Sequence, residues 1–153
     1  MVTSKRIRKI LVPTDGSNRA AKGIREAVRL ARALRARVDG ICVIAPSPAA
    51  YGEHGRYYLG GLTLADYRKY TRRTAAKALG VIERVAKNAG VPCATQSVTD
   101  AKPWHGILRA ARAKRADLIV MASHGRGAIS TLLLGSETSR VLAQSRIPVL
   151  VAR

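Results

Sequence analysis

The sequence predicts a single α/β domain with three layers, in which a sheet lies between helices. Segments with strand character alternate along the chain with segments of helical periodicity, and this alternation is typical of such folds. The chain has 153 residues, of which 47 % are hydrophobic, so it can bury one core. No apolar run approaches the ~20 residues needed to cross a membrane. Residues 1–153 are therefore expected to form one domain.

The first unit of the chain is predicted to be strand, helix, strand. Residues 7–13 are an apolar run that indicates a strand, and Asp15, Gly16 and Ser17 indicate a turn. Ser17 or Asn18 can cap the helix that follows. That helix has apolar residues at helical spacing, namely Ile24, Ala27, Val28, Ala31 and Leu34. Because residues 38–45 predict a second strand, the unit is a right-handed parallel crossover.

The middle of the chain contains a long irregular segment and a long helix. Residues 46–61 are rich in glycine and proline, as in a lid, a partner surface or a disordered loop. Thr63 and Asp66 form a weak capping-box pattern, and helical periodicity runs from there to about Asn88. Gly90 fits the end of this helix.

The last third of the chain is expected to supply three strands and two helices. Residues 91–98 predict a third strand, which Pro92 places at a sheet edge or makes start late. Pro103 fits the first turn of the next helix. Residues 118–121 are wholly apolar, as in a strand buried on both faces, and residues 147–152 predict the last strand.

The segment after the fourth strand combines features of an anion site. Residues 123–127 are small or flexible, and a helical pattern begins at Ser136 after Gly135. The N-terminus of a helix offers free N–H groups and the positive end of its dipole. The segment therefore supplies two loops of exposed N–H groups at the carboxyl end of a buried strand.

These residues resemble the nucleotide-binding signature of the universal stress protein family, which is glycine, two residues, glycine, nine residues, glycine and serine or threonine. Gly125 and Gly135-Ser136 match it, whereas Ala122 stands in place of the first glycine. Residues 9–17 and 148–151 also resemble the family, so the similarity covers nearly the whole chain. The family's glycine before the third-helix proline is likewise replaced, by Ala101.

The resemblance implies a Rossmann-like fold of the adenine nucleotide alpha hydrolase type, with five parallel strands in the order 3-2-1-4-5. Ligands of such sheets bind beyond the carboxyl ends of the strands where the order reverses, here between strands one and four. The implied ligand is ATP or a related adenine nucleotide, with Mg²⁺ as an option. The implied contact residues are Pro13, Thr14, Asp15, Val43, Met121, Ala122, His124, Gly125, Arg126, Gly127, Gly135, Ser136, Glu137 and Thr138.

Several of these residues have a second, purely structural interpretation. Asp15 can bind ribose, base or metal, or form an Asx turn with the backbone of Ser17. Ser136 and Thr138 can donate to phosphate or take part in capping a helix. Val43 matches the family position whose backbone contacts adenine, and it is equally a core valine. Ala122 weakens binding if the missing glycine serves close approach of ribose, and is tolerated if its φ is negative.

The sequence leaves three functions open. The first is an adenine-nucleotide-binding stress protein, with at most slow ATP hydrolysis, because no Walker loop, catalytic dyad or carboxylate pair lies near the loops. The second is a dimeric interaction protein of the same family that does not bind nucleotide. The third is a basic nucleic-acid-associated protein, since the formal net charge is +19. The third is not favoured, because the cations are spread over every helix and no aromatic-basic surface motif is found.

Assembly, location and metal content are also predicted. The apolar residues 148–151 are expected to form an edge strand, which a second copy of the chain covers in a homodimer. The chain is expected to be cytoplasmic. Cys42 and Cys93 are expected to be core thiols in strands, and the three histidines lie far apart, so we expect no structural metal.

Overall fold

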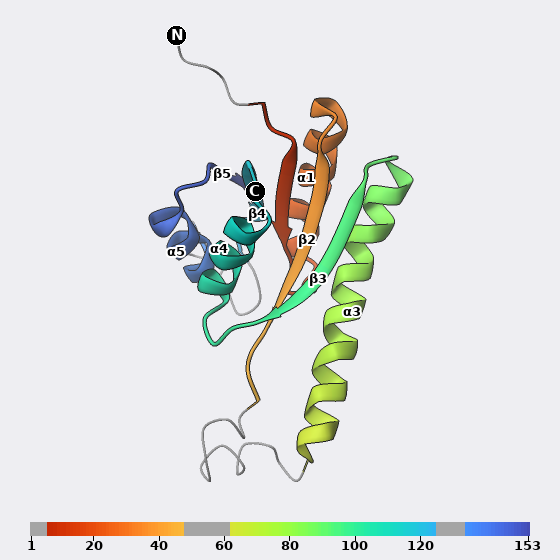
Figure 1. Cartoon of the computed structure of the whole chain (residues 1–153), viewed down its shortest axis with the longest axis vertical. Helices are drawn as coiled ribbons and strands as arrows, with labels where there is room; N and C mark the ends of the chain where they lie inside the picture. Colours follow the sequence, from red (N-terminus) through yellow and green to blue (C-terminus); the bar gives the residue numbers. More distant parts are fainter. Residues whose placement is uncertain (1–5, 48–61, 125–133) are drawn as a thin grey trace.

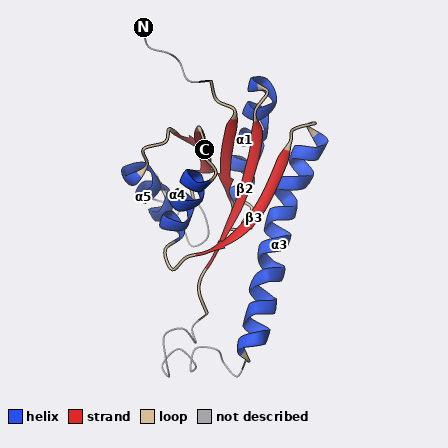
Figure 2. Cartoon of the chain, in the orientation of Figure 1, coloured by secondary structure: helices blue, strands red, loops and turns tan. Residues whose placement is uncertain are grey.

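The computed structural model describes residues 6–47, 62–124 and 134–153. It contains a five-stranded sheet in which every pairing is parallel and the strand order is β3-β2-β1-β4-β5. This confirms the predicted fold class and the strand order that the resemblance implied. Figure 2 shows the strands in red, with helices in blue to either side. Of the predicted irregular segment 46–61, residues 48–61 lie outside the described residues.

The described elements alternate along the chain. The strands are β1 (Lys9–Pro13), β2 (Arg37–Ile44), β3 (Cys93–Thr99), β4 (Leu118–Ala122) and β5 (Val149–Ala152). The helices are α1 (Ala20–Leu34), α3 (Leu64–Asn88), α4 (Pro103–Ala113) and α5 (Ser136–Gln144). Among the described residues, no helix is long and apolar enough to cross a membrane.

The helices form two layers, with α1 and α3 on one face of the sheet and α4 and α5 on the other (Figure 1). A hydrophobic core lies on each face of the sheet. Successive side chains of a strand point to opposite faces, so each central strand contributes side chains to both cores. In β1, for example, Ile10 and Val12 pack in the α1/α3 core, while Leu11 packs in the α4/α5 core. Cys42 and Cys93 are free thiols on β2 and β3, as predicted.

Three strands start later than the sequence predicted. β1 starts at Lys9 and not at residue 7, and the N–H groups of Arg8 and Lys9 donate to the Asp117 carboxylate (3.0 and 3.1 Å). A proline explains the other two cases. β3 starts after Pro92 and β5 starts after Pro148, because proline has no N–H to donate to a neighbouring strand. In addition, the N–H of Val91 donates to the Ala86 carbonyl at the end of α3 (2.9 Å). The N–H of Ile147 donates to the Ser145 hydroxyl (3.0 Å), so it is also lost to the sheet.

The helix ends follow the predicted signals. Thr63 caps α3 in a complete capping box with Asp66, and Gly90 ends the helix with a φ of 66°. Ser17 contributes at the start of α1, where its hydroxyl oxygen accepts the N–H of Ala20 (3.2 Å). α1 itself begins only at Ala20, after a turn through residues 18 and 19.

Candidate functional site

The carboxyl end of β1 is held by short-range hydrogen bonds. Thr14 is buried, and its N–H donates to the Ile41 carbonyl of β2 (2.9 Å). The Thr14 hydroxyl accepts the N–H of Gly16 (3.1 Å), and the Asp15 carboxylate accepts the N–H of Ser17 (2.9 Å). Gly16 has a φ of 76°, which favours glycine. The predicted Asx turn is therefore present, and it fixes the Asp15 carboxylate at the end of the strand.

The carboxyl end of β4 lies beside the start of α5. The N–H of Gly135, which precedes the helix, donates to the Ser123 carbonyl (2.7 Å). Thr138 is 3 % exposed, and its hydroxyl donates to the Ala122 carbonyl (3.0 Å). These two bonds join the first turn of α5 to the residues that follow β4. The N-terminus of α5 therefore lies at the end of the sheet where parallel sheets bind ligands, as the sequence predicted.

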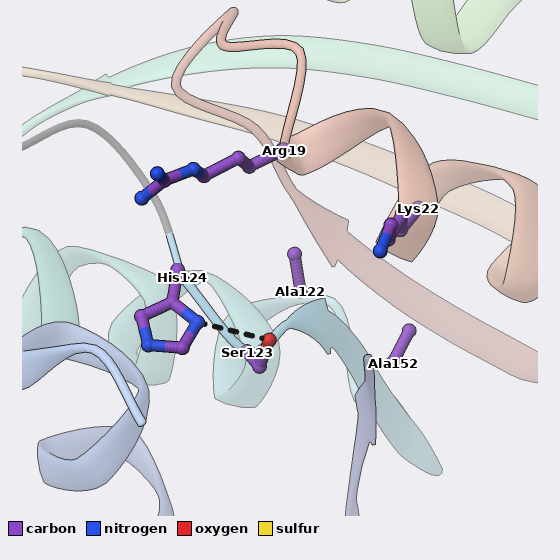
Figure 3. Close-up of a pocket in the computed structure, with 6 residues that line it drawn as sticks. All are labelled: Arg19, Lys22, Ala122, Ser123, His124 and Ala152. Carbon is purple, nitrogen blue, oxygen red and sulfur yellow. Dashed lines mark hydrogen bonds between the residues drawn. The ribbon is translucent and has the colours of Figure 1, made fainter. Parts of the chain in front are cut away.

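A pocket of about 150 Å³ opens at this end of β4 (Figure 3). Its lining consists of Arg19, Lys22, Ala122, Ser123, His124 and Ala152. The two cations come from the start of α1, whereas the remaining residues come from the ends of β4 and β5. The Ser123 hydroxyl and the His124 Nδ1 are 3.1 Å apart in the pocket wall. Because the charged members of the lining are cations, the pocket is suited to an anionic group.

α1 reaches the pocket because one of its residues is glycine. A Cβ atom on Gly23 would lie 2.7 Å from the Ala122 nitrogen and 3.0 Å from the Met121 carbonyl carbon. Both atoms belong to the β4 backbone, which cannot move aside at low cost. The absence of a side chain at Gly23 therefore lets the first turn of α1, with Lys22, come close to the end of β4.

Carboxylates near this end of the sheet are used to hold loops and helices. Asp15 accepts the N–H of Ser17, as described above, and Glu137 accepts the N–H of Trp104 at the start of α4 (2.8 Å). Asp100 accepts the N–H of Lys102 (3.1 Å) and bonds the His105 ring (2.8 Å). Both hydrogen bonds hold the pKa of Asp100 below its usual value, and the bond from the Lys102 N–H has the larger effect. Each of these carboxylates thus has a structural partner.

Ala122 fits its position without backbone strain. Among the described residues other than glycine, only Arg35 and Arg115 have a positive φ, so Ala122 lies in the ordinary region for an L residue. Its methyl group borders the pocket. The replacement of the signature glycine is therefore tolerated by the backbone, and its consequence is confined to the space that one methyl group occupies.

The structure places the predicted contact residues in three groups. Ala122 and His124 line the pocket, and Gly135 and Ser136 stand at the start of α5 next to it. Pro13, Thr14 and Asp15 lie at the end of the neighbouring strand β1. The side chains of Met121 and Val43 pack in the α4/α5 core, so only their backbones remain for a ligand. Gly125, Arg126 and Gly127 lie outside the described residues.

Sequence reasoning missed the cationic side of the pocket. The even spread of cations over the helices gives no reason to single out Arg19 and Lys22 from the other basic residues. Their position was the available signal, because they occur directly after a strand end and at a spacing of three, which places them on one side of a helix turn. The remaining basic residues of that helix lie further from the carboxyl end of the sheet.

The family of the chain follows from comparison with known proteins. The model of the universal stress protein family matches residues 6–153. The chain belongs to this family. Universal stress protein MJ0531 of Methanocaldococcus jannaschii is 31 % identical over 146 residues, which are 95 % of this chain and 82 % of that protein. A universal stress protein of Thermus aquaticus is 31 % identical over 144 residues, or 94 % and 97 % of the two chains.

Solved structures of universal stress proteins share the fold. UspA of Lactobacillus plantarum superposes with a TM-score of 0.76 at 25 % identity, covering 97 % of this chain and 99 % of its own. A universal stress protein in complex with cAMP superposes with a TM-score of 0.68 at 23 % identity, covering 97 % of this chain and 98 % of its own. The universal stress protein from Archaeoglobus fulgidus in complex with dAMP superposes with a TM-score of 0.66 at 20 % identity, covering 97 % of this chain and 99 % of its own.

Proposed function

We propose that this universal stress protein binds ATP or a related adenine nucleotide and acts in the cytoplasm as a stress-response signalling module. The observation that carries the proposal is the cationic pocket at the end of β4, next to the N-terminus of α5. The phosphates of a nucleotide are an anionic group of the kind that suits this pocket, and they are attached to a ribose and a base that can extend along the neighbouring strand ends. The family members whose structures contain cAMP and dAMP support an adenine nucleotide as the ligand.

The phosphate groups are assigned to the pocket and to the start of α5. The first N–H groups of a helix have no partner within the helix and favour an anion. Gly135 has no side chain that could cap α5, and the structure records no side-chain cap there. Arg19 and Lys22 stand across the pocket and would add two charge-assisted contacts. Ser136 would donate its hydroxyl, and Gly125, Arg126 and Gly127 are assigned to the same phosphates from the signature alone.

The nucleoside is assigned to the end of β1 and to its neighbours in the sheet. The Asp15 carboxylate accepts one N–H through Oδ1, and we assign it a ribose hydroxyl as a further donor. Pro13, Thr14 and Val43 would border the base. Val43 would do so through its backbone, because its side chain is packed in the core. A pocket of about 150 Å³ is smaller than the ~300–1,000 Å³ of typical small-molecule sites, so it accounts for the phosphate end only.

The described residues favour binding over catalysis. Hydrolysis of ATP needs a group that positions or deprotonates water. Of the carboxylates near this end of the sheet, Asp15 is assigned to the ribose, and Asp100 and Glu137 accept N–H groups at the start of α4. Mg²⁺, when present, would be held by the phosphates themselves, since the described residues contain no cluster of three or more metal-ligating side chains. We therefore assign slow hydrolysis at most.

Mass spectrometry of ligand released from the purified protein tests this function. The expected result is an adenine nucleotide at a substantial fraction of the protein concentration. The matched control is the Gly135→Asp variant, whose new carboxylate would occupy the start of α5 and leave no nucleotide to be released. Release of no nucleotide from the parent, together with no uptake of added ATP, would favour the non-nucleotide interaction protein instead.

We also propose that the protein is a homodimer that pairs through β5. β5 stands at the edge of the sheet, as predicted, and it pairs only with β4 among the described strands. The carbonyls of Pro148 and Ala152 accept hydrogen bonds from β4. Because neighbouring residues of a strand point their backbone groups to opposite sides, those of Val149 and Val151 face outward. A second copy would satisfy these groups.

Light scattering of a Val151→Pro variant tests the dimer. Proline removes an outward N–H and leaves the bonds to β4 in place, so the variant should be a folded monomer whereas the parent is a dimer. Leu150 is a poorer position for the test, because its side chain packs against the α1/α3 core. A monomeric parent would refute the dimer, and a dimeric variant would place the interface elsewhere.

A further inference from the structure

The first three turns of α3 extend past the sheet. Between Leu64 and Thr74 no residue is buried, and Ala75 is the first buried residue of the helix. In Figure 1 this half of α3 runs beyond the carboxyl end of β2, whereas the second half covers the sheet. The eleven residues span ~16 Å at 1.5 Å per residue. Within the described part of the chain, no side chain of this helical segment is part of the hydrophobic core.

The exposed half of α3 carries four cations. Arg68, Lys69, Arg72 and Arg73 are all exposed, and among the described residues none of them forms an ion pair. The one acidic residue of this segment, Asp66, is engaged by the hydroxyl and the N–H of Thr63, which lower its pKa. The capping box also occupies the N-terminus of α3, so the surface depends on side chains and not on the helix dipole.

The spacing of these cations is unfavourable unless an anion covers them. Arg68 and Arg72 are four residues apart, and so are Lys69 and Arg73, and like charges at this spacing destabilise a helix. Arg68 also precedes the core residues Ala75 and Ile82 by two and four turns, so it lies on the stripe that faces the sheet further along. The helix therefore presents a cation where an inward-facing apolar residue would otherwise be expected.

A tyrosine stands beside two of the four cations. Tyr70 is 68 % exposed, and its neighbours around the helix are Arg73, three residues further on, and Lys69. Arg68 and Arg72 each lie about 160° from Tyr70 around the helix, at about 100° per residue. Tyr67 is turned toward the body of the protein, where its hydroxyl donates to the Ala45 carbonyl (3.3 Å). The segment thus combines an exposed aromatic ring with cations, a combination that the sequence analysis did not recognise because it lies on a helix.

Among the described helices, the larger total positive charge belongs to the layer that contains α3. α1 contains four basic residues and one acidic residue, and α3 contains seven basic and two acidic residues. On the other face α4 contains two basic residues and no acidic one, and α5 contains one of each. Per residue, α1, α3 and α4 carry nearly the same net charge, as the expected even distribution has it, and the length of α3 gives its layer the larger total. Such a surface repels a second copy of the chain and attracts a polyanion.

We propose that the exposed half of α3 binds single-stranded nucleic acid. The cations follow one another around the helix from Arg68 and Arg72 to Lys69 and Arg73. They contact the backbone phosphates of a strand that crosses the helix, and the ring of Tyr70, at the end of this series, stacks on a base. Cations that follow the backbone and an aromatic ring for the bases are the two elements of sequence-tolerant single-strand binding. An acidic polypeptide would use the cations but has no flat base for Tyr70, and a duplex would keep its bases stacked inside.

Fluorescence anisotropy with a labelled DNA strand of about 20 nucleotides tests the proposal, since known single-strand modules cover about 4–16 nucleotides. The test variant replaces Arg68, Lys69, Arg72 and Arg73 with Gln, which keeps a high helix propensity. A matched control removes the same charge from exposed positions outside α1 and α3, by replacing Lys102, Arg112, Arg115 and Arg146 with Gln. Equal thermal unfolding midpoints would establish that both variants fold.

We expect the test variant to lose at least about tenfold in affinity, and the slope of log K against log salt to fall by about 3, since each phosphate contact on a single strand contributes about 0.7. The control should stay within about twofold of the parent. Tyr70→Ala should weaken single-strand binding about fivefold and leave duplex binding unchanged.

Three results would overturn the proposal. Equal losses in the test and control variants would mean that binding follows total charge and not α3. A duplex that binds as tightly as the single strand, with Tyr70→Ala silent, would remove the stacking contact. Polyglutamate of equal charge that binds more tightly than the oligonucleotide would identify an acidic protein as the partner.

Discussion

The carboxyl ends of β1 and β4 lie side by side in the sheet, yet they are built in different ways. The end of β1 is closed by hydrogen bonds of its own turn, in which Thr14 and Asp15 each accept a backbone N–H. The end of β4 opens into a pocket that Arg19 and Lys22 border, and α5 starts next to it. One end is therefore a fixed acidic turn, and the other is a cationic recess.

This difference assigns the two parts of a nucleotide to the two strand ends. A fixed carboxylate is suited to ribose hydroxyls, and a recess with cations and free N–H groups is suited to phosphates. Changes at the end of β4 should therefore affect ATP more than adenosine, whereas changes at the end of β1 should affect both alike. Parallel titrations with the two ligands can separate these outcomes.

Gly135→Asp should have the largest effect, a loss of at least about a hundredfold in ATP affinity. Aspartate is a favourable helix-capping residue, so its carboxylate would accept the N–H groups of α5 and repel phosphate without unfolding the protein. Calorimetric titration measures the loss, and Gly135→Ala is the control, since alanine fits the φ of −66° and leaves the N–H groups open. Unchanged ATP affinity in the folded aspartate variant would remove α5 from the site.

The double replacement Arg19→Gln and Lys22→Gln should weaken ATP binding by about ten- to a hundredfold. Each glutamine can still donate a neutral hydrogen bond of about 0.5–1.5 kcal/mol in place of a charged one of about 1.5–3 kcal/mol, so each residue loses about 1–1.5 kcal/mol. Adenosine binding should change little. The control is Arg25→Gln with Arg32→Gln, which removes the same charge from exposed positions of the same helix. If both double variants lose ATP affinity equally, the effect is one of net charge and the pocket is not the phosphate site.

Ala122→Gly should tighten ATP binding by up to about tenfold, because it removes a methyl group from the pocket wall and overpacking typically costs about 1–3 kcal/mol. The same change should lower the free energy of unfolding by about 0.5–1 kcal/mol, since glycine weakens a strand. Titration and urea unfolding of one preparation measure both quantities. A variant that binds no better than the parent would mean that the methyl group does not meet the ligand.

Asp15→Asn should have the smallest effect, about a fivefold loss for ATP and adenosine alike, because a charged acceptor is replaced by a neutral one. The asparagine oxygen can still accept the Ser17 N–H, so the unfolding free energy should stay the same. Asp15→Ala loses that acceptor and should cost about 1 kcal/mol of stability. A loss confined to ATP would place the phosphates at the end of β1 and reverse the comparison.

The sequence predicted the fold well, because burial follows periodicity. Apolar runs and helical spacing located each described strand and helix, and the resemblance supplied the strand order. The start of β5 was predicted too early because Pro148, which cannot donate to a strand, lies inside its apolar run. Of the two glycine-flanked loops expected after β4, residues 125–133 lie outside the described residues.

The charged groups were predicted less well, for a physical reason. Periodicity tells which side of a helix is polar, but it does not tell what that side faces. Arg19 and Lys22 belong to the same polar side as Arg25, yet only the first two line the pocket. Likewise, the stripe that is apolar from Ala75 onward is interrupted at Arg68, but the sequence alone does not tell that the first half of α3 extends past the sheet, because that depends on the length of the strands it covers.

Calorimetric comparison of ATP and adenosine binding to the unmodified protein tests the central claim most directly, which is that the end of β4 receives phosphate. ATP should bind at least about a hundredfold more tightly than adenosine at low salt, with AMP between them, because each charge-assisted contact contributes about 1.5–3 kcal/mol. The difference should shrink as salt screens the cations. Equal affinities for ATP and adenosine at all salt concentrations would contradict the account.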